Sequence, residues 1–164
     1  MHNQTSDAGS GSGSGGGDKR EAGFLTLMVD GQLCGVPVLA VRDVISNSIV
    51  TRIPLAPPEI AGNINLRGRI VTAIDLRRRL CLTPAPAGMK RIAVVAEEAG
   101  GGYALLVDQA LEVLTLDMNE IEAPPPTLGA SWIEFSSGIF RLPERLMVVL
   151  EISRLILLEA KVAA

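Results

Sequence analysis

GNINLRGRIVTAIDLRRRL, residues 62–80, combines five arginines with a strongly aliphatic run. Residues 65–68 (Asn-Leu-Arg-Gly) predict a turn between two extended segments, because glycine tolerates a positive φ and an asparagine side chain can hydrogen-bond to the nearby backbone. The run 70–74 is apolar at almost every position, which is typical of a strand buried on both faces. We expect the three arginines at 77–79 to form a short helical turn with solvated side chains. The stretch therefore predicts a turn, a core strand and an exposed basic cluster.

The remainder of the chain predicts a mainly β fold. Apolar runs at 24–29 and 33–39 flank an Asp-Gly pair, a strong signal for a two-residue hairpin turn. Residues 41–45 are compatible with a short helix or an extended connection, and residues 56–60 (APPEI) with the start of a helix. Further elements are expected as strands at 91–96, 103–107, 110–116, 131–135, 138–142 and 145–152, a rigid proline crossing at 122–127, and a final helix at 153–161 that Ser153 could cap.

The composition favours one domain, or two small barrels sharing a core, in a reducing compartment. Hydrophobic residues make up 48% of the 164 residues but aromatic residues only 3%, so the core must consist mainly of Val, Leu, Ile and Ala. Cys34 and Cys81 have apolar neighbours and no C-x-x-C spacing, and we interpret them as small core residues of a cytoplasmic protein. Residues 1–22 are rich in Gly and Ser and predict a disordered tail. No apolar run is long enough to span a membrane.

The sequence offers little for catalysis or metal binding. Its only histidine, His2, lies in the Gly/Ser-rich tail, so we expect no Ser-His-Asp or Cys-His arrangement and no histidine-ligated metal within the fold. The carboxylates of Asp30, Asp75, Asp108 and Glu144 lie at predicted turns or strand ends, where they are expected to be solvated or to cap turns. We therefore expect a protein that is not an enzyme and that has no cofactor and no metal.

The arginines between Arg67 and Arg79 leave a second function open. Five arginines and Asp75 give residues 62–80 a local charge of +4 (five minus one), which could bind phosphates. However, the stretch has no Phe, Tyr or Trp to stack on bases, and a net charge of −3 gives the chain no general attraction to nucleic acid. A small β-barrel that binds nucleic acid is therefore the alternative to a protein-binding role. For protein binding Arg67 stands out, because a turn can fix its guanidinium where it holds a carboxylate in two parallel hydrogen bonds.

The order of these motifs resembles that of the CheW-like domains of bacterial chemotaxis over residues 23–164. The stretch 62–80 is similar to the family's Gly-x-x-Asn-Leu-Arg-Gly-x-Ile-x-x-x-Asp-Leu-Arg motif. The other matching segments are LCGVPVLAVRDVI (33–45, first hairpin and following segment), LLVDQALEVL (105–114, Val-Asp element), IEAPPP (121–126, proline crossing) and GIFRLPERLMVVLEISRLI (138–156, the family's ending, with Glu144-Arg145 at its acidic-Arg pair).

The resemblance implies two five-stranded SH3-like β-barrel subdomains packed around a shared aliphatic core, with short helices and a C-terminal helix. It also implies a free-standing, non-enzymatic adaptor that couples chemoreceptors to the histidine kinase CheA. Such an adaptor is cytoplasmic and is recruited to membrane-associated receptor arrays without inserting into the membrane. No nucleic acid is a partner under this interpretation.

The resemblance also assigns candidate binding residues. The positions associated with receptor binding are Val41, Asp43, Gly62, Asn65, Arg67 and Gly68. For CheA binding, Val38 and Leu39 are the apolar candidates. We further expect Arg67 to form an ion pair with Asp43, and this pair to orient the receptor-facing groove.

Overall fold

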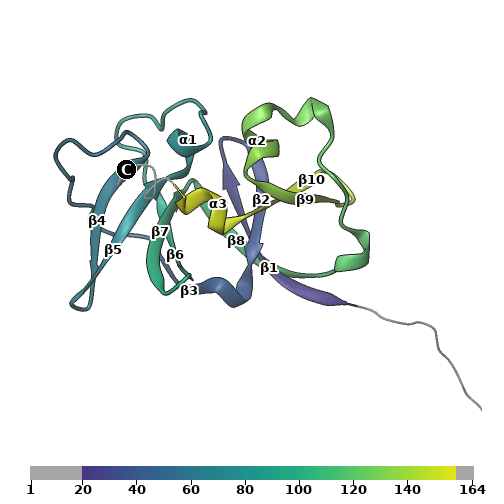
Figure 1. Cartoon of the computed structure of the whole chain (residues 1–164), viewed down its shortest axis with the longest axis horizontal. Coiled ribbons are helices and arrows are strands. Elements are labelled where there is room, and N and C mark those ends of the chain that lie inside the picture. Colours follow the sequence, from purple (N-terminus) through teal and green to yellow (C-terminus); the bar gives the residue numbers. More distant parts are fainter. Residues whose placement is uncertain (1–19, 158–164) are drawn as a thin grey trace, which may run out of the picture.

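The computed structural model describes residues 20–157 and contains two five-stranded sheets (Figure 1). Sheet A has the order β8-β1-β2-β10-β9 and consists of β1 (Glu21–Val29), β2 (Gln32–Pro37), β8 (Gln109–Asp117), β9 (Ser136–Arg141) and β10 (Leu146–Leu150). Sheet B has the order β3-β6-β7-β5-β4 and consists of β3 (Val41–Ile45), β4 (Ile60–Leu66), β5 (Arg69–Asp75), β6 (Ile92–Glu98) and β7 (Gly101–Val107). The predicted mainly β fold with two five-stranded units is confirmed. The pairings between these described strands do not include one that closes either sheet into a barrel.

Short helices connect the strands. The α-helices are α1 (Leu76–Arg79), α2 (Ala130–Glu134) and α3 (Ile152–Ile156), and the 3₁₀ turns are η1 (Val38–Ala40), η2 (Met118–Glu120) and η3 (Pro126–Leu128). Within residues 20–157, none of the helices has the length and the apolar character that crossing a membrane requires.

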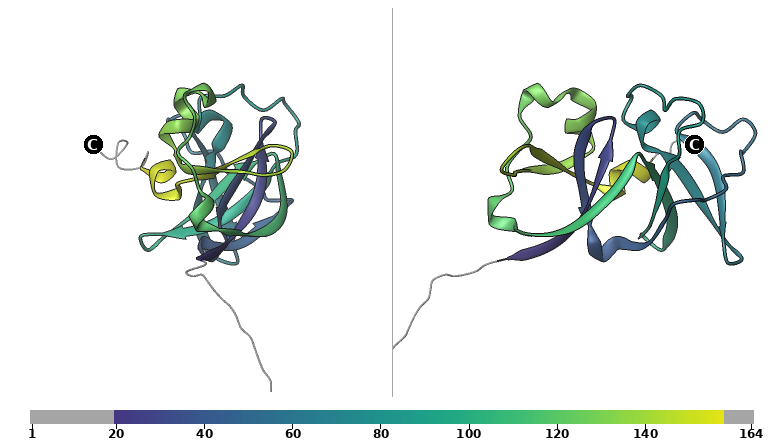
Figure 2. Two further views of the ribbon diagram at one scale, coloured as in Figure 1. Left: turned by 90° about the vertical axis from the view of Figure 1, so that its right-hand side faces the viewer. Right: turned by 180° about the vertical axis from the view of Figure 1, so that it is seen from behind.

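The two sheets have the same connectivity and exchange one strand with each other. In sheet A the hairpin β1-β2 is antiparallel and β2 runs parallel to β10, and in sheet B the hairpin β6-β7 is antiparallel and β7 runs parallel to β5. The strand that follows each hairpin leaves its own sheet, because β3 pairs with β6 and β8 pairs with β1. Figures 1 and 2 show the sheets side by side with α3 between them. Since each sheet needs a strand from the other, neither is complete alone.

Tight turns set the register of three hairpins. Their two central residues are Asp30-Gly31 (φ 51° and 80°), Arg67-Gly68 (53° and 87°) and Ala99-Gly100 (53° and 81°). Two successive positive φ angles are the mark of a type I′ turn, whose twist matches that of the flanking strands. The predicted turns at Asp30-Gly31 and at residues 65–68 are therefore confirmed.

The core is aliphatic and largely shared. Its main cluster joins residues of both sheets, such as Leu27 and Leu105, and smaller clusters around Ile64 and Phe140 lie within sheet B and sheet A respectively. The predicted shared core is confirmed. Ile70, which was expected inside, is 62% exposed, because β7 pairs with β5 only from Thr72 onward and leaves the start of β5 uncovered.

Two segments differ from their predicted structure. Residues 131–134 are helical instead of extended: α2 contains Trp132 and is followed directly by Phe135, and both side chains are buried in the shared core. A short apolar run does not distinguish a strand from a buried helical turn, which explains the wrong prediction. Residues 56–60 start no helix, and the chain enters β4 at Ile60.

Several local predictions also need correction. Cys34 is buried as expected, but Cys81 is exposed. Helix α3 begins after Glu151, and the Ser153 hydroxyl does not cap the helix but donates to the Glu151 carboxylate at 3.0 Å. Strand β1 takes in residues 21 and 22 of the predicted tail. The rest of that tail up to residue 19, and the predicted helical residues 158–161, lie outside the described residues.

Arg77 joins the two sheets through a buried ion pair. It belongs to α1, which follows β5 of sheet B, and its side chain is 10% exposed. Its Nε and Nη2 donate to the two carboxylate oxygens of Asp108 at 3.0 and 2.8 Å, and its Nη1 lies 3.4 Å from the carboxylate of Asp30 in the β1-β2 turn. Asp108 is the single residue between β7 of sheet B and β8 of sheet A. Asp108 in turn accepts from the Asp30 N–H at 2.7 Å and donates its own N–H to the Met28 carbonyl at 2.9 Å, so the bidentate pair connects α1 to the end of β1 and the turn after it in sheet A.

Arg79 makes a second connection between the sheets. Its Nε donates to the carbonyl of Leu155 at 2.8 Å and its Nη2 to that of Arg154 at 3.0 Å, both in α3 after sheet A. Its guanidinium lies 4.5 Å from the ring centroid of Phe135. The expectation of a solvated cluster at 77–79 is therefore correct only for Arg78, since Arg77 and Arg79 are each 8% exposed.

Asp108, expected to be solvated, has a pKa below its usual range. Burial raises the pKa of this carboxyl. Hydrogen bonds from Arg77 and from the Asp30 N–H, together with the charges of Arg77 and Arg91, lower the pKa by more than burial raises it. A carboxyl whose pKa is lower in the folded state stabilises the fold above its unfolded pKa, which is about 3.9 for aspartate. This contribution is lost as the pH falls through the folded pKa.

Asp108→Asn is expected to lower the free energy of unfolding at pH 7 by about 3 kcal/mol, because buried Arg77 then keeps only the more distant and more exposed carboxylate of Asp30 as a counter-charge. Below about pH 3.9 the deficit should shrink, since Asp108 of the wild type then protonates in the unfolded state and, at still lower pH, in the folded state. Urea unfolding followed by the fluorescence of Trp132, the chain's one tryptophan, measures both effects. The exposed-carboxylate control Asp43→Asn should change little at either pH. A deficit of equal size at both pH values would contradict the assignment.

Candidate functional site

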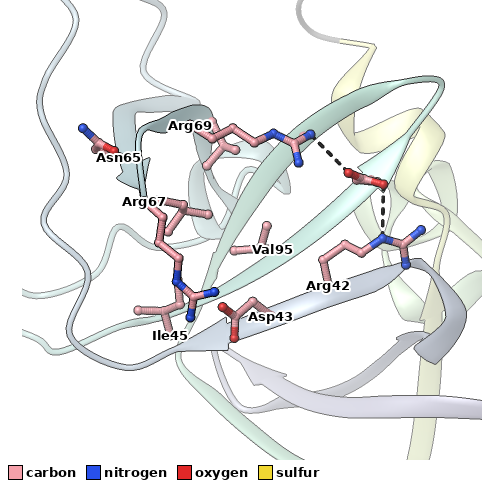
Figure 3. A pocket seen from close by; sticks show the side chains of 11 residues that line it. Arg42, Asp43, Ile45, Asn65, Arg67, Arg69 and Val95 are labelled. Carbon is pink, nitrogen blue, oxygen red and sulfur yellow. Dashed lines mark hydrogen bonds and ion pairs between the residues drawn. The ribbon is translucent and has the colours of Figure 1, made fainter.

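A groove of about 450 Å³ opens on sheet B beside the Arg67-Gly68 turn (Figure 3). Its lining comes from β3, the β4-β5 hairpin, β6 and β7, and consists of Arg42, Asp43, Ile45, Asn65, Leu66, Arg67, Arg69, Val71, Val95, Glu97 and Gly102. Ile45, Val71 and Val95 give the groove apolar surface, and charged side chains surround it. An apolar centre with a polar rim is typical of a surface that binds another protein.

Glu97 ties together three strands at this groove. One of its oxygens accepts from Arg42 Nε and the other from Arg69 Nη2, both at 3.1 Å, so β6 is linked to β3 and to β5 (Figure 3). These hydrogen bonds from Arg69 and Arg42 lower the pKa of Glu97. Arg42 also donates to the carbonyl of Leu39 at 2.9 Å, which attaches η1 to the same network. Arg42 and Arg69 are thus already paired with a carboxylate of this chain, although both side chains are exposed.

Arg67 and Asp43 both line the groove, but the predicted ion pair between them is wrong. Figure 3 shows the Arg67 guanidinium reaching toward Asp43, yet no salt bridge among residues 20–157 includes either residue. Asp43 Oδ1 accepts from the Val44 N–H at 2.8 Å instead. Within the described part of the chain Arg67 has no hydrogen bond or ion pair, and its exposed position on the turn leaves its donors available to a carboxylate from outside.

Asn65, Gly68 and Gly62 determine the course of the backbone around the groove. The Asn65 side chain accepts from the Gly68 N–H at 2.9 Å, which closes the turn as predicted. Gly62 is buried: it lies at a bulge in β4 with φ 149°, and a Cβ there would overlap the carbonyl oxygen of Thr51. The close approach allows Thr51 and Asn63 to exchange two backbone hydrogen bonds of 2.8 Å.

The remaining predicted residues lie next to the groove on η1 and the start of β3. Val41 is half-buried against the shared core, so only part of its side chain can meet a partner. Val38 is half-buried, and one of its methyl groups and one of Val113 lie close to the position that a Cβ of Gly23 in β1 would occupy. Leu39 is 87% exposed. The structure therefore brings Asp43, Asn65 and Arg67 together in one site, with the others at its edge or beneath it.

Arg42, Arg69 and Glu97 were missed by the sequence analysis. They lie on three strands that are distant along the chain. Arg42 and Glu97 are close because β3 pairs with β6, and Arg69 reaches Glu97 from β5 across Gly102 of β7, which has no side chain in the way. Only the strand register reveals this neighbourhood, and no local motif marks it. Over residues 20–157 no group of three or more His, Cys, Asp or Glu side chains is placed to hold a metal ion.

The sequence and structure match one protein family. The family model of the CheW-like domain covers residues 23–159. The chain belongs to the CheW-like family. It is 31% identical over 127 residues to the probable chemotaxis protein CheW of Rhizobium etli, covering 77% of this chain and 81% of that protein. It is 35% identical over 104 residues to the chemotaxis protein CheW of Bacillus subtilis, covering 62% and 65%.

The similarity to a solved CheW structure extends over both sheets. The crystal structure of the scaffolding protein TtCheW from Thermoanaerobacter tengcongensis is similar with a TM-score of 0.73 at 28% identity, and the match covers 80% of this chain and 89% of that one.

Gly62→Ala should be much more destabilising than Gly68→Ala. Alanine at Gly68 has open space and incurs only the strain of a positive φ, about 1 kcal/mol. Alanine at Gly62 must also push away the Thr51 backbone, which raises the expected loss of unfolding free energy to about 3 kcal/mol. Urea unfolding of the two variants measures the difference. Equal losses would show that Gly62 is not held against residue 51.

Proposed function

We propose that this CheW-like protein couples chemoreceptors to the histidine kinase CheA by binding both at once through separate surfaces. Its relatives are chemotaxis proteins, and a solved structure of the same fold is a scaffolding protein. Proteins of this family are scaffolds and not enzymes. An adaptor of this kind acts by raising the effective concentration of one partner near the other. Its place of action is the cytoplasm, at the receptor arrays.

The receptor surface in this proposal is the groove on sheet B, and the observation that carries it is the unpaired Arg67 above apolar side chains. A cation without an internal partner can form a charge-assisted pair with a carboxylate of another protein. Asp43 and Asn65 add an acceptor and an amide beside it, and Val41 and Gly68 lie at the edge. Gly62 acts indirectly, by shaping β4. The fitting partner is the cytoplasmic tip of a methyl-accepting receptor that presents a carboxylate next to apolar side chains.

The CheA surface in this proposal is η1, where Leu39 projects into solvent and Val38 packs over β1. An aliphatic side chain that is 87% exposed lacks internal contacts, so a partner can bury it at little cost to the fold. The partner segment would be the CheW-like regulatory domain of CheA. The surface lies where the chain passes from β2 of sheet A to β3 of sheet B.

The nucleic-acid alternative is not supported. Of the five arginines between residues 67 and 79, Arg77 and Arg79 are buried and Arg69 is paired with Glu97. The two that remain, Arg67 and Arg78, lie at opposite ends of β5 and form no continuous basic strip for a phosphate backbone.

A pull-down with purified CheA and a receptor cytoplasmic fragment tests the proposal. Arg67→Glu should weaken receptor binding about tenfold or more while leaving CheA binding unchanged, because the charge meets only the receptor. Leu39→Asp should do the reverse, since a buried carboxylate at the CheA surface is unfavourable.

Arg78→Glu is the matched control, because it changes an exposed arginine of the same motif that faces neither surface. It should bind both partners as the wild type does. Failure of the wild type to bind either protein would refute the adaptor proposal, and an equal loss of both partners in Arg67→Glu would refute the division into two surfaces.

A further inference from the structure

The contact region between the two sheets, here called the seam, contains two buried arginines, Arg77 and Arg79. Neither proposed binding surface uses them. Arg77 and Arg79 leave the same short helix of sheet B and both end in sheet A or its connections. Helix α1 lies at the end of β5 opposite to the β4-β5 turn that forms the groove (Figure 1). Their burial is therefore not explained by contact with a receptor or with CheA.

The acceptors of these two arginines favour one orientation of the sheets relative to each other. Arg77 uses Nε, Nη1 and Nη2 for Asp108 and the carbonyl of Thr83, and its Nη1 also faces Asp30. Arg79 uses Nε and Nη2 for two successive carbonyls of α3. Planar guanidinium groups with several acceptors in fixed directions restrict rotation, which an apolar contact alone does not.

The proposed binding surfaces depend on this orientation. The groove belongs entirely to sheet B, whereas Val38 of the CheA surface packs over Gly23 of sheet A. The connection between them is short, and consists of the three-residue backbone of η1 and the hydrogen bond from Arg42 of the groove to the Leu39 carbonyl. A small rotation of one sheet against the other would therefore change the angle between a bound receptor and a bound kinase without altering either contact.

We infer that Arg77 and Arg79 are positioning residues for signalling: they hold the two sheets in the one orientation that lets a bound receptor control a bound kinase. This inference rests on the proposed function. Lysine at either position keeps the charge but loses the fork of donors, so Arg77→Lys and Arg79→Lys loosen the orientation without an unpaired charge. Two variants are used so that the inference can still be tested if one of them fails to fold.

The first readout is the distance between the sheets, and it needs no partner. Spin labels on Ile70→Cys in sheet B and Ser137→Cys in sheet A, both exposed positions, report it by pulsed dipolar spectroscopy. Cys81→Ser removes the exposed native thiol, and buried Cys34 stays unlabelled. Both lysine variants should give a broader distance distribution than the wild type. The matched control Ile64→Val, in the core of sheet B away from the seam, should remain narrow.

The second readout is CheA activity with receptor-containing vesicles. Each lysine variant should bind the receptor fragment and CheA separately within about twofold of the wild type, because the seam is distant from both surfaces. Receptor control of kinase activity should fall about fivefold or more, a typical size for a lost coupling between sites. Ile64→Val should retain full control, because a stability loss alone leaves the orientation intact.

Narrow distances in both lysine variants, or broad distances with full kinase control, would overturn the inference. Equal defects in Ile64→Val would overturn it too, since general destabilisation would then suffice. If the wild type binds neither partner, the proposed function fails instead, and the distance measurement still decides whether the arginines fix the sheets.

Discussion

The bidentate contact between Arg77 and Asp108 occurs where the chain passes from sheet B to sheet A, and the rest of the structure depends on it. The two sheets exchange strands, so their relative placement is also a condition for the pairing of β8 with β1 and of β3 with β6. The apolar core between them is aliphatic and tolerates sliding more readily than a set of directed hydrogen bonds does. The ion pair adds directed hydrogen bonds to an apolar contact that would, by itself, allow several orientations of the sheets.

The groove follows from the same constraints at the other end of sheet B. A type I′ turn raises Arg67 above β5, a glycine at position 62 lets residue 51 approach β4, and Glu97 secures β3 and β5 on either side of β6 and β7. The protein satisfies Arg42 and Arg69 internally and leaves Arg67 without an internal partner. Because the turn already fixes the backbone of Arg67, binding a carboxylate has only the side chain left to order, which suits a recognition surface.

The sequence predicted the features that local chemistry determines. Hairpin turns, the aliphatic core and the Asn65-to-Gly68 turn follow from glycine, asparagine and apolar periodicity. Long-range partners were not predictable: Arg77 looked solvated because its acceptor lies 31 residues away, and the expected pairing of Arg67 with Asp43 ignored the closer Val44 N–H. Trp132 and Phe135 were placed in a strand because a short apolar run fits the residue spacing of a helix as well as that of a strand. Glu97 escaped notice since only strand register connects it to the groove.

A titration of the adaptor against fixed amounts of CheA and receptor vesicles tests the central claim most directly. A protein that bridges two partners through separate surfaces should bring CheA down with the vesicles in increasing amounts, and then in decreasing amounts once excess adaptor occupies each partner separately. The wild type should show both the rise and the fall. Sedimentation of CheA that is independent of the adaptor, or that never declines at large excess, would contradict the claim that one molecule joins the two.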